Sequence, residues 1–191
     1  MKNKALIISL LVGIITISIG CGLKSENTSG SVSENNTTSV SEEKAELVSV
    51  DISNYGIPLT IMIPEGAEVS KSLLGSMEID GVTNFSVDVE KGKFLMNISM
   101  LDVDIEGETM EDMMEWQIES LSEEAGFEII QQDETGLIYK TEDEEIGLDY
   151  SFYHLIIKND REISITTGVS LMENFTLEEV KEIYAAAQQA K

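Results

Sequence analysis

The chain of 191 residues is poor in the side chains that carry most metal and redox chemistry, with one cysteine and one histidine. A single cysteine cannot form an internal disulfide. A single cysteine and a single histidine also cannot supply the ligands of a structural zinc site. The sequence therefore excludes a disulfide-stabilised scaffold and a Cys/His zinc domain.

Recognisable catalytic and nucleotide-binding motifs are also missing. The sequence contains no Gly-x-Ser-x-Gly nucleophile elbow, no phosphate-binding loop ending in Gly-Lys-Ser/Thr, and no Gly-x-Gly-x-x-Gly. We therefore expect a protein that is not an enzyme and has no cofactor. A carboxylate-dependent hydrolase is kept as an alternative, because acidic residues are abundant and paired carboxylates can hydrolyse glycosides.

Basic residues are scarce: 12 Lys and Arg stand against 36 Asp and Glu, which gives a net charge of −24. Residues 102–134 contain 13 acidic residues and no basic one. Such a surface repels nucleic acid and anionic lipid headgroups, so we expect no nucleic-acid partner. The simplest interpretation of the charge is solubility outside the cytoplasm. Attraction of cations or basic proteins is the alternative.

Residues 1–20 have the layout of a secretory signal peptide. Lys2 and Lys4 precede an uncharged, mostly apolar run over residues 5–19, and the small Gly20 follows. A helix that spans a bilayer needs roughly 20 apolar residues, and this run is shorter. The segment therefore predicts export rather than a transmembrane helix.

The residues that end this segment, Ser18-Ile19-Gly20-Cys21, resemble the lipobox of bacterial lipoproteins. The resemblance implies cleavage before Cys21 and acylation of its thiol, for example with palmitate. It also implies two or three acyl chains, which hold a protein in a membrane where one chain is marginal. We therefore expect a lipoprotein of the cell envelope that faces the periplasm or the cell exterior. The alternatives are an ordinary secretory signal with an incidental cysteine, or an uncleaved anchor.

Cys21 is followed by a polar tether. Residues 22–46 are mostly Ser, Thr, Asn, Glu and Gly, and no aromatic residue occurs among them. Such a segment cannot bury enough apolar surface to offset the entropy lost on ordering. We expect residues 21–46 to be a lipidated cysteine and a disordered tether, with a typical span of roughly 25–30 Å.

Residues 47–191 are predicted to form a single α+β domain. Apolar and polar residues alternate over residues 85–89 and 94–100, and again over 146–156 and 163–169. Two alternating runs joined by a short turn are typical of a β-hairpin, so two hairpins are expected. Shorter strands are expected at residues 56–64, 127–131 and 136–141.

Two helices are marked by apolar spacing and by their first residues. One is expected to begin at Thr109 and to run to Gly126. The other is expected to begin at Thr176, with Glu179 placed three residues later as in a capping box. The order of elements predicts an antiparallel sheet of about six to seven strands, with a central helix and a C-terminal helix packed on it.

The stretches IPLTIMIPEGAEV, GETMEDMMEW and NFTLEEVKEIY carry a resemblance to a known fold. In this order they resemble the PsbP-like fold of bacterial lipoproteins and of a thylakoid lumen protein. They resemble still more closely small, functionally uncharacterised lipoproteins of Bacteroidota type. The resemblance covers about residues 52–188. It implies the fold and brings no catalytic motif.

Asp102, Asp104 and Glu106, followed by glycine, resemble the start of a calcium-binding loop. A complete loop ends in a bidentate glutamate, and the equivalent position here is Met113, which cannot bind calcium. The segment is better explained as a strand-to-helix junction capped by Thr109. The three acidic residues are kept as weak candidates for a cation site, and no metal site is predicted with any other residue.

Three further groups of residues have a structural and a functional interpretation. We expect His154 to be a hydrogen-bonded core or edge histidine rather than a catalytic base. We expect Trp116 to be partly buried packing rather than a platform for a ligand. Methionines can fill irregular cores or bind copper(I), and core filling is favoured. These methionines are Met96, Met100, Met110, Met113 and Met114.

Taken together, the sequence predicts a non-catalytic domain, anchored to the membrane by Cys21, that binds or assists an envelope protein partner. The ligand is unknown from the sequence. The alternative is a weak binding module for divalent cations or a basic partner, using the acidic residues 102–112.

Overall fold

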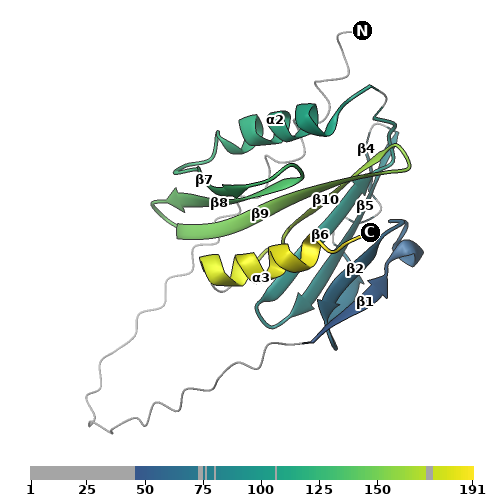
Figure 1. Cartoon of the computed structure of the whole chain (residues 1–191), viewed down its shortest axis with the longest axis horizontal. Coiled ribbons are helices and arrows are strands. Elements are labelled where there is room, and N and C mark those ends of the chain that lie inside the picture. Colours follow the sequence, from purple (N-terminus) through teal and green to yellow (C-terminus); the bar gives the residue numbers. More distant parts are fainter. Residues whose placement is uncertain (1–45, 73–74, 76, 80, 106, 171–173) are drawn as a thin grey trace, which may run out of the picture. The chain divides into compact units, whose positions relative to one another are not determined.

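The computed structural model describes residues 46–191, apart from 73–74, 76, 80, 106 and 171–173 (Figure 1). The predicted signal peptide, Cys21 and the tether up to residue 45 lie outside the described residues. No described helix is long and apolar enough to cross a membrane. The described elements are β1 (Leu47–Asp51), η1 (Ser53–Tyr55), β2 (Thr60–Pro64), β3 (Glu68–Lys71), β4 (Met77–Ile79), β5 (Val82–Lys91), β6 (Phe94–Leu101), α2 (Met110–Leu121), β7 (Glu128–Gln132), β8 (Gly136–Asp143), β9 (Gly147–Lys158), β10 (Arg161–Thr167) and α3 (Leu177–Ala187).

The main sheet has eight strands, with the path β3-β5-β6-β10-β9-β8-β7 and β4 paired to β5. Every ladder in it is antiparallel. β1 and β2 form a separate antiparallel pair. The predicted α+β class, an antiparallel sheet with two helices, is confirmed. The short strands β1, β3 and β4 were not predicted.

Both predicted hairpins are present, and their turns explain their register. In the β5–β6 hairpin, Val87 lies opposite Ile98, and Gly92 in the turn has a φ of 58°. In the β9–β10 hairpin, Asn159 and Asp160 have φ values of 53° and 57°. Two consecutive residues with positive φ form the turn whose twist matches that of antiparallel strands.

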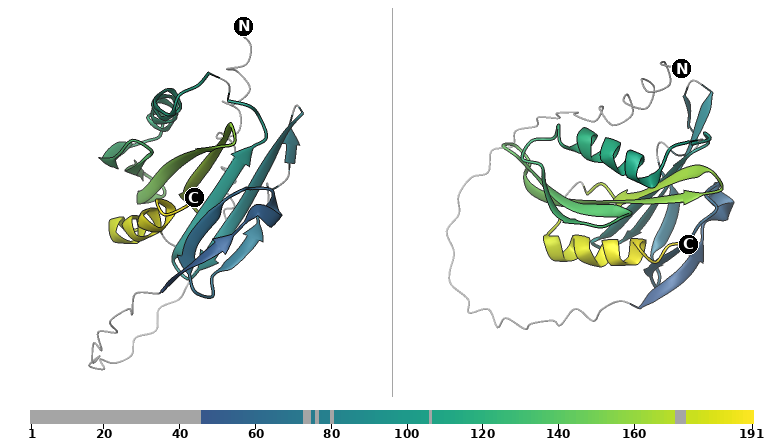
Figure 2. Two further views of the ribbon diagram at one scale, coloured as in Figure 1. Left: turned by 45° about the vertical axis from the view of Figure 1, so that its right-hand side comes forward. Right: turned by 45° about the horizontal axis from the view of Figure 1, so that its top comes forward.

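The two helices lie on opposite faces of the sheet (Figure 2). On one face, α3 and the β1–β2 pair cover a core that includes Phe152 and Ile165. On the other face, α2 covers a smaller core that includes Leu137 and Leu155. β9 contributes Phe152 to one core and Leu155 to the other, because neighbouring residues of a strand point to opposite faces. This explains the nearly continuous apolar sequence of β9.

Three details of the sequence prediction are wrong. α2 ends at Leu121, and Ala125 is exposed in the turn that follows. The backbone of this turn bonds instead to β8, where the Glu142 N–H donates to the Ala125 carbonyl at 2.9 Å. Ile146 is expected on the same strand face as Phe152, but it lies in the β8–β9 turn and is 69% exposed. Val169 lies beyond the end of β10 and is 80% exposed.

Candidate functional site

The acidic junction between β6 and α2 is tied to the only arginine of the chain. Arg161, the first residue of β10, donates from Nε to Oδ1 of Asp102 at 3.0 Å and from Nη1 to Oδ1 of Asp104. Hydrogen bonds to Asp102 and Asp104 raise the pKa of Arg161. A cation at this place must therefore displace the guanidinium from two carboxylates. Glu106, the third candidate ligand, lies outside the described residues.

Thr109 and Asp112 form the predicted cap at the start of α2. The Thr109 hydroxyl accepts from the Asp112 N–H at 3.2 Å, and Oδ2 of Asp112 accepts from the Thr109 N–H at 3.1 Å. The hydrogen bonds from Thr109 lower the pKa of Asp112. This reciprocal pair is a capping box and satisfies N–H groups that the helix leaves open. Asp112 is thus committed to local structure.

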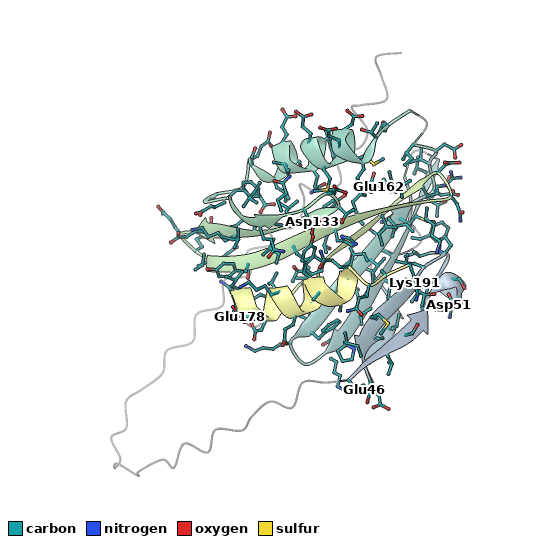
Figure 3. All side chains as sticks on the ribbon, in the orientation of Figure 1. Glu46, Asp51, Asp133, Glu162, Glu178 and Lys191 are labelled. Carbon is teal, nitrogen blue, oxygen red and sulfur yellow. The ribbon has the colours of Figure 1, made fainter. Side chains whose placement is uncertain are left out.

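The side of α2 that faces away from the sheet carries uncompensated acidic charge. Glu111, Glu115 and Glu119 are exposed and follow one another at intervals of four residues. Residues spaced in this way line up on one face of a helix. α2 contains no lysine or arginine. Figure 3 shows the oxygen-tipped side chains that point away from the sheet along α2. We call Glu111, Glu115, Glu119 and the neighbouring Trp116 the acidic face of α2.

Trp116 is partly buried, as predicted, but it keeps 39% of its surface exposed and is not among the residues that pack against the core beneath α2. Its neighbours at helical spacing are Asp112, Met113, Glu119 and Ser120. An exposed indole beside carboxylates provides both a flat aromatic face and negative charge, and a basic side chain is attracted to both.

Beneath α2, two tyrosines each lie beside a carboxyl group with a raised pKa. Burial raises the pKa of Glu162, the charge of Glu108 adds to this, and a 3.1 Å hydrogen bond from the Tyr153 hydroxyl opposes it. Burial also raises the pKa of Glu124, whose charge acts on Tyr139. Raised carboxyl pKa values are typical of catalytic acids but also occur in structural settings.

The placement of these two acids gives no support to a hydrolase. Glu162 is coupled to Glu108, which precedes α2, whereas Glu124 follows its last turn. A helix of 12 residues is about 18 Å long. Paired carboxylates of glycoside hydrolases are separated by at most roughly 9.5 Å. Among the residues that the structure describes, no group of three or more His, Cys, Asp or Glu is placed to hold a metal ion.

A third polar group lies on the opposite face, under α3. His154 is 6% exposed, and the rings of His154 and Tyr184 meet edge to face with centroids 5.9 Å apart. Nδ1 of His154 is buried and has no hydrogen-bond partner among the described residues. The predicted inward position is confirmed. The prediction of a hydrogen-bonded histidine does not hold for Nδ1, although a hydrogen bond with the backbone of Thr135 acts on the ring and raises its pKa.

The five methionines that suggested either core filling or copper do not converge on one point. Met96 and Met100 belong to the core under α3, and Met113 and Met114 belong to the core under α2. Met110 packs at the edge of the second core. Because the sheet separates the two groups, they cannot act together as ligands of one ion.

Several residues with a role in these groups were not found from the sequence. Arg161 had one available signal, since it is the only arginine in an acidic chain. No such signal marked Asp133, Tyr184 and Glu162, because their partners are distant in sequence.

Comparisons with known protein families, with curated proteins and with solved structures find no match to this chain. The resemblance to PsbP-like lipoproteins stays a prediction.

Proposed function

We propose that this chain is a cell-envelope lipoprotein anchored through Cys21, whose folded domain binds a basic protein segment on the acidic face of α2. The anchor is supported by the signal-like residues 1–20 and the lipobox-like residues before Cys21. The binding role is supported by one structural observation: α2 displays three exposed glutamates beside a half-exposed tryptophan, without a basic residue on the helix.

The rigidity of α2 favours a binding role for its outer side. Met113, Met114 and Leu121 are buried against the sheet and fix the rotation of the helix. The glutamates therefore stand on the outer side of the helix. Complementary charge steers a basic partner and selects against acidic ones. The attraction falls as salt rises, because ions screen exposed charges beyond about 10 Å at 0.1 M.

The contacts of residues 102–112 favour a different binding segment from the one expected from the sequence. Residues 102–112 were the candidate, but Asp102 and Asp104 are engaged by Arg161, and Asp112 caps the helix. The proposed surface therefore begins at Glu111 and continues along α2 to Glu119. It needs no metal ion.

The anchor is tested with labelled palmitate in bacterial cells that express the full chain. Wild type incorporates label, and globomycin leaves the uncleaved precursor. Cys21→Ser takes up no label and is recovered outside the membrane fraction. A labelled Cys21→Ser protein contradicts the anchor.

Binding is tested with the full-length chain in detergent and an oligoarginine peptide as the probe. Trp116 is the only tryptophan, so its fluorescence reports contact at this face without an added label. The variant Glu111→Gln/Glu115→Gln/Glu119→Gln is expected to bind at least tenfold more weakly. The control Glu144→Gln/Glu145→Gln/Glu178→Gln removes the same charge from the exposed β8–β9 turn and from the start of α3, and is expected to bind like wild type. Equal weakening in both variants reduces the effect to net charge and contradicts the proposed site.

The natural partner is sought by crosslinking in intact cells, followed by purification of the full chain. Wild type and this control variant are expected to capture the same protein. The α2 variant is expected to lose it. Capture that is unchanged in the α2 variant places the binding surface elsewhere.

A further inference from the structure

His154 lies where α3 crosses the β8–β9 hairpin. On β9 it is opposite Gly136 of β8 and Ile165 of β10. Gly136 is closely surrounded, because a Cβ at this position would lie 2.4 Å from the Tyr153 carbonyl oxygen and 2.7 Å from the Tyr184 hydroxyl oxygen. The absence of a side chain therefore lets Tyr184 of α3 reach across the strand to the turn before β8.

The hydroxyl of Tyr184 ends at Asp133, which joins α3 to this turn. Oδ2 of Asp133 accepts from Tyr184 at 2.6 Å and from Gln188 Nε2 at 2.8 Å. Oδ1 accepts from the N–H and the hydroxyl of Thr135 at 2.9 and 3.0 Å. We call the three side chains Asp133, Tyr184 and Gln188 the Asp133 latch. Both carboxylate oxygens are already occupied.

The surroundings of His154 favour its neutral form. The titratable groups that face it are Asp133, from the turn before β8, and Tyr184, from α3. Its neighbours on β8 and β10 are the uncharged Gly136 and Ile165. A proton added at Nδ1 would have no acceptor in the present arrangement. A buried donor without an acceptor costs free energy.

We propose that protonation of His154 opens the Asp133 latch and releases α3 from the sheet. Among the described residues, the carboxylate whose charge acts on His154 is that of Asp133. An imidazolium that draws this carboxylate toward itself takes it from Tyr184 and Gln188. The domain thereby acquires a conformational response to acid that is separate from partner binding on α2.

The release extends past the helix. Lys191 donates its N–H to the Thr60 carbonyl at 3.0 Å and accepts from the Thr60 N–H at 2.9 Å. These bonds attach the residues after α3 to the edge of β2. A helix that lifts from the sheet pulls on this attachment. We therefore expect acid to affect residues 177–191 together, with the β5–β6 hairpin unaffected.

The direction of the pH effect follows from the histidine. Burial lowers the pKa of His154, and the charge of Asp133 and the backbone of Thr135 oppose this without reversing it. Well above pH 6.5 the imidazole is neutral whether α3 is closed or open. Below this pH the open form takes up a proton more readily than the closed form, so opening increases as pH falls. The increase is at most about tenfold at one pH unit below 6.5.

The chain offers a direct measurement, because His154 is its only histidine. NMR titration of the imidazole in the full-length protein in detergent is expected to give a pKa below 6.5. Hydrogen exchange, corrected for intrinsic rates, is expected to show residues 177–191 losing protection severalfold between pH 7 and pH 5.5. An imidazole that titrates at or above 6.5, or protection of α3 that is constant over this range, overturns the proposal.

Variants separate the histidine from general acid effects. His154→Leu removes the titration and is expected to abolish the pH response of α3 protection. Asp133→Asn removes the accepting carboxylate of the latch and is expected to lower the protection of α3 already at pH 7. The control Glu144→Gln removes one charge in the exposed β8–β9 turn and is expected to leave this protection unchanged. If His154→Leu does not fold, hydrogen exchange of wild type and Asp133→Asn still decides. Protection of α3 that is unchanged at pH 7 in Asp133→Asn overturns the proposal.

Discussion

The Tyr184 hydroxyl donates a 2.6 Å hydrogen bond to Oδ2 of Asp133, a residue 51 positions earlier in the chain. This bond joins the last helix to the turn between β7 and β8. Burial pushes the pKa of Asp133 upward, but the hydrogen bonds from Tyr184, Thr135 and Gly136 together leave it below the ordinary value. The carboxylate is therefore stabilised in its charged form by the fold.

Tyr184→Phe removes this one donor and keeps the aromatic ring. A hydrogen bond to a charged group contributes roughly 1.5–3 kcal/mol, and Gln188 still donates to Asp133. We therefore expect a loss of about 1–2 kcal/mol in urea unfolding at pH 7. The control Tyr150→Phe removes a hydroxyl away from Asp133 and is expected to change stability by less than about 0.5 kcal/mol. Equal effects in both variants contradict a specific role of the Tyr184 bond.

Thr176→Ala removes the cap at the start of α3. The Thr176 hydroxyl accepts from the Glu179 N–H at 3.4 Å, and Oε2 of Glu179 accepts from the Thr176 N–H at 2.8 Å. Loss of a Thr cap costs about 1 kcal/mol, which urea unfolding at pH 7 measures. Thr176→Ser keeps the hydroxyl and is expected to recover most of this stability.

The capping carboxylate adds a pH dependence to the same variant. Burial raises the pKa of Glu179. The hydrogen bonds from Thr176 and the interaction with Lys93 lower this pKa by more than burial raises it, so the net shift is downward. A carboxylate whose pKa is lowered in the folded state stabilises the fold at pH values above its ordinary pKa. This stabilisation is lost as the pH falls through the pKa of the folded state. The difference between wild type and Thr176→Ala is therefore expected to shrink below about pH 4. A constant difference from pH 7 to pH 3 contradicts this mechanism.

Glu162→Gln is expected to stabilise the domain at neutral pH. Burial, reinforced by Glu108, raises the pKa of Glu162, so its contribution to stability is present in acid and lost as pH rises through the folded value. Glutamine stays neutral and keeps an oxygen to accept from Tyr153. Urea unfolding is expected to show a higher midpoint for the variant at pH 7 and no difference at pH 4. The control Glu144→Gln is exposed and is expected to show neither effect.

Arg161→Gln tests what holds the acidic junction. Ion pairs with exposed partners contribute about 0–1 kcal/mol, so the variant is expected to lose less than about 1 kcal/mol at low salt. The loss is expected to vanish at high salt, where the pairs are screened. Because Arg161 occupies Asp102 and Asp104, millimolar calcium is expected to leave the melting temperature of wild type unchanged. A calcium-induced rise in wild type contradicts the idea that the arginine excludes cations.

The parts of the fold that were predictable are those set by neighbours in sequence. Thr176 and Glu179 are three residues apart, and the turn at Asn159 joins adjacent strands, so local pattern was sufficient. The end of α2 was not predictable in this way. Residues 122–125 continue the helical spacing, but the Ala125 carbonyl bonds to Glu142 of a strand that lies later in the chain.

The candidate sites were less predictable because they depend on distant partners. Arg161 meets Asp102 across 59 residues. The surroundings of His154 depend on which helix covers its face of the sheet. The alternation of side chains along a strand predicts the face on which a residue lies, but it does not predict which helix covers that face. Parity placed His154 on the same face as Phe152 correctly, whereas the contact with Tyr184 depends on a helix that comes later in the chain. The prediction of Asp102 as a weak cation ligand likewise did not include its hydrogen bond with Arg161, because the two residues are far apart in sequence.

The sheet path has a consequence for how the chain folds. Most described ladders join strands that are close in chain order, such as β5–β6 and β9–β10, and only β6–β10 joins distant halves. Its register pairs Ile98 with Ile165, which lie on either side of α2, β7, β8 and β9. Closing a long loop is entropically costly and slows folding. We therefore expect two units, one formed by β3 to β6 and the other by β7 to β10, to form independently. The two units are then expected to pair in a slow final step, through the β6–β10 ladder.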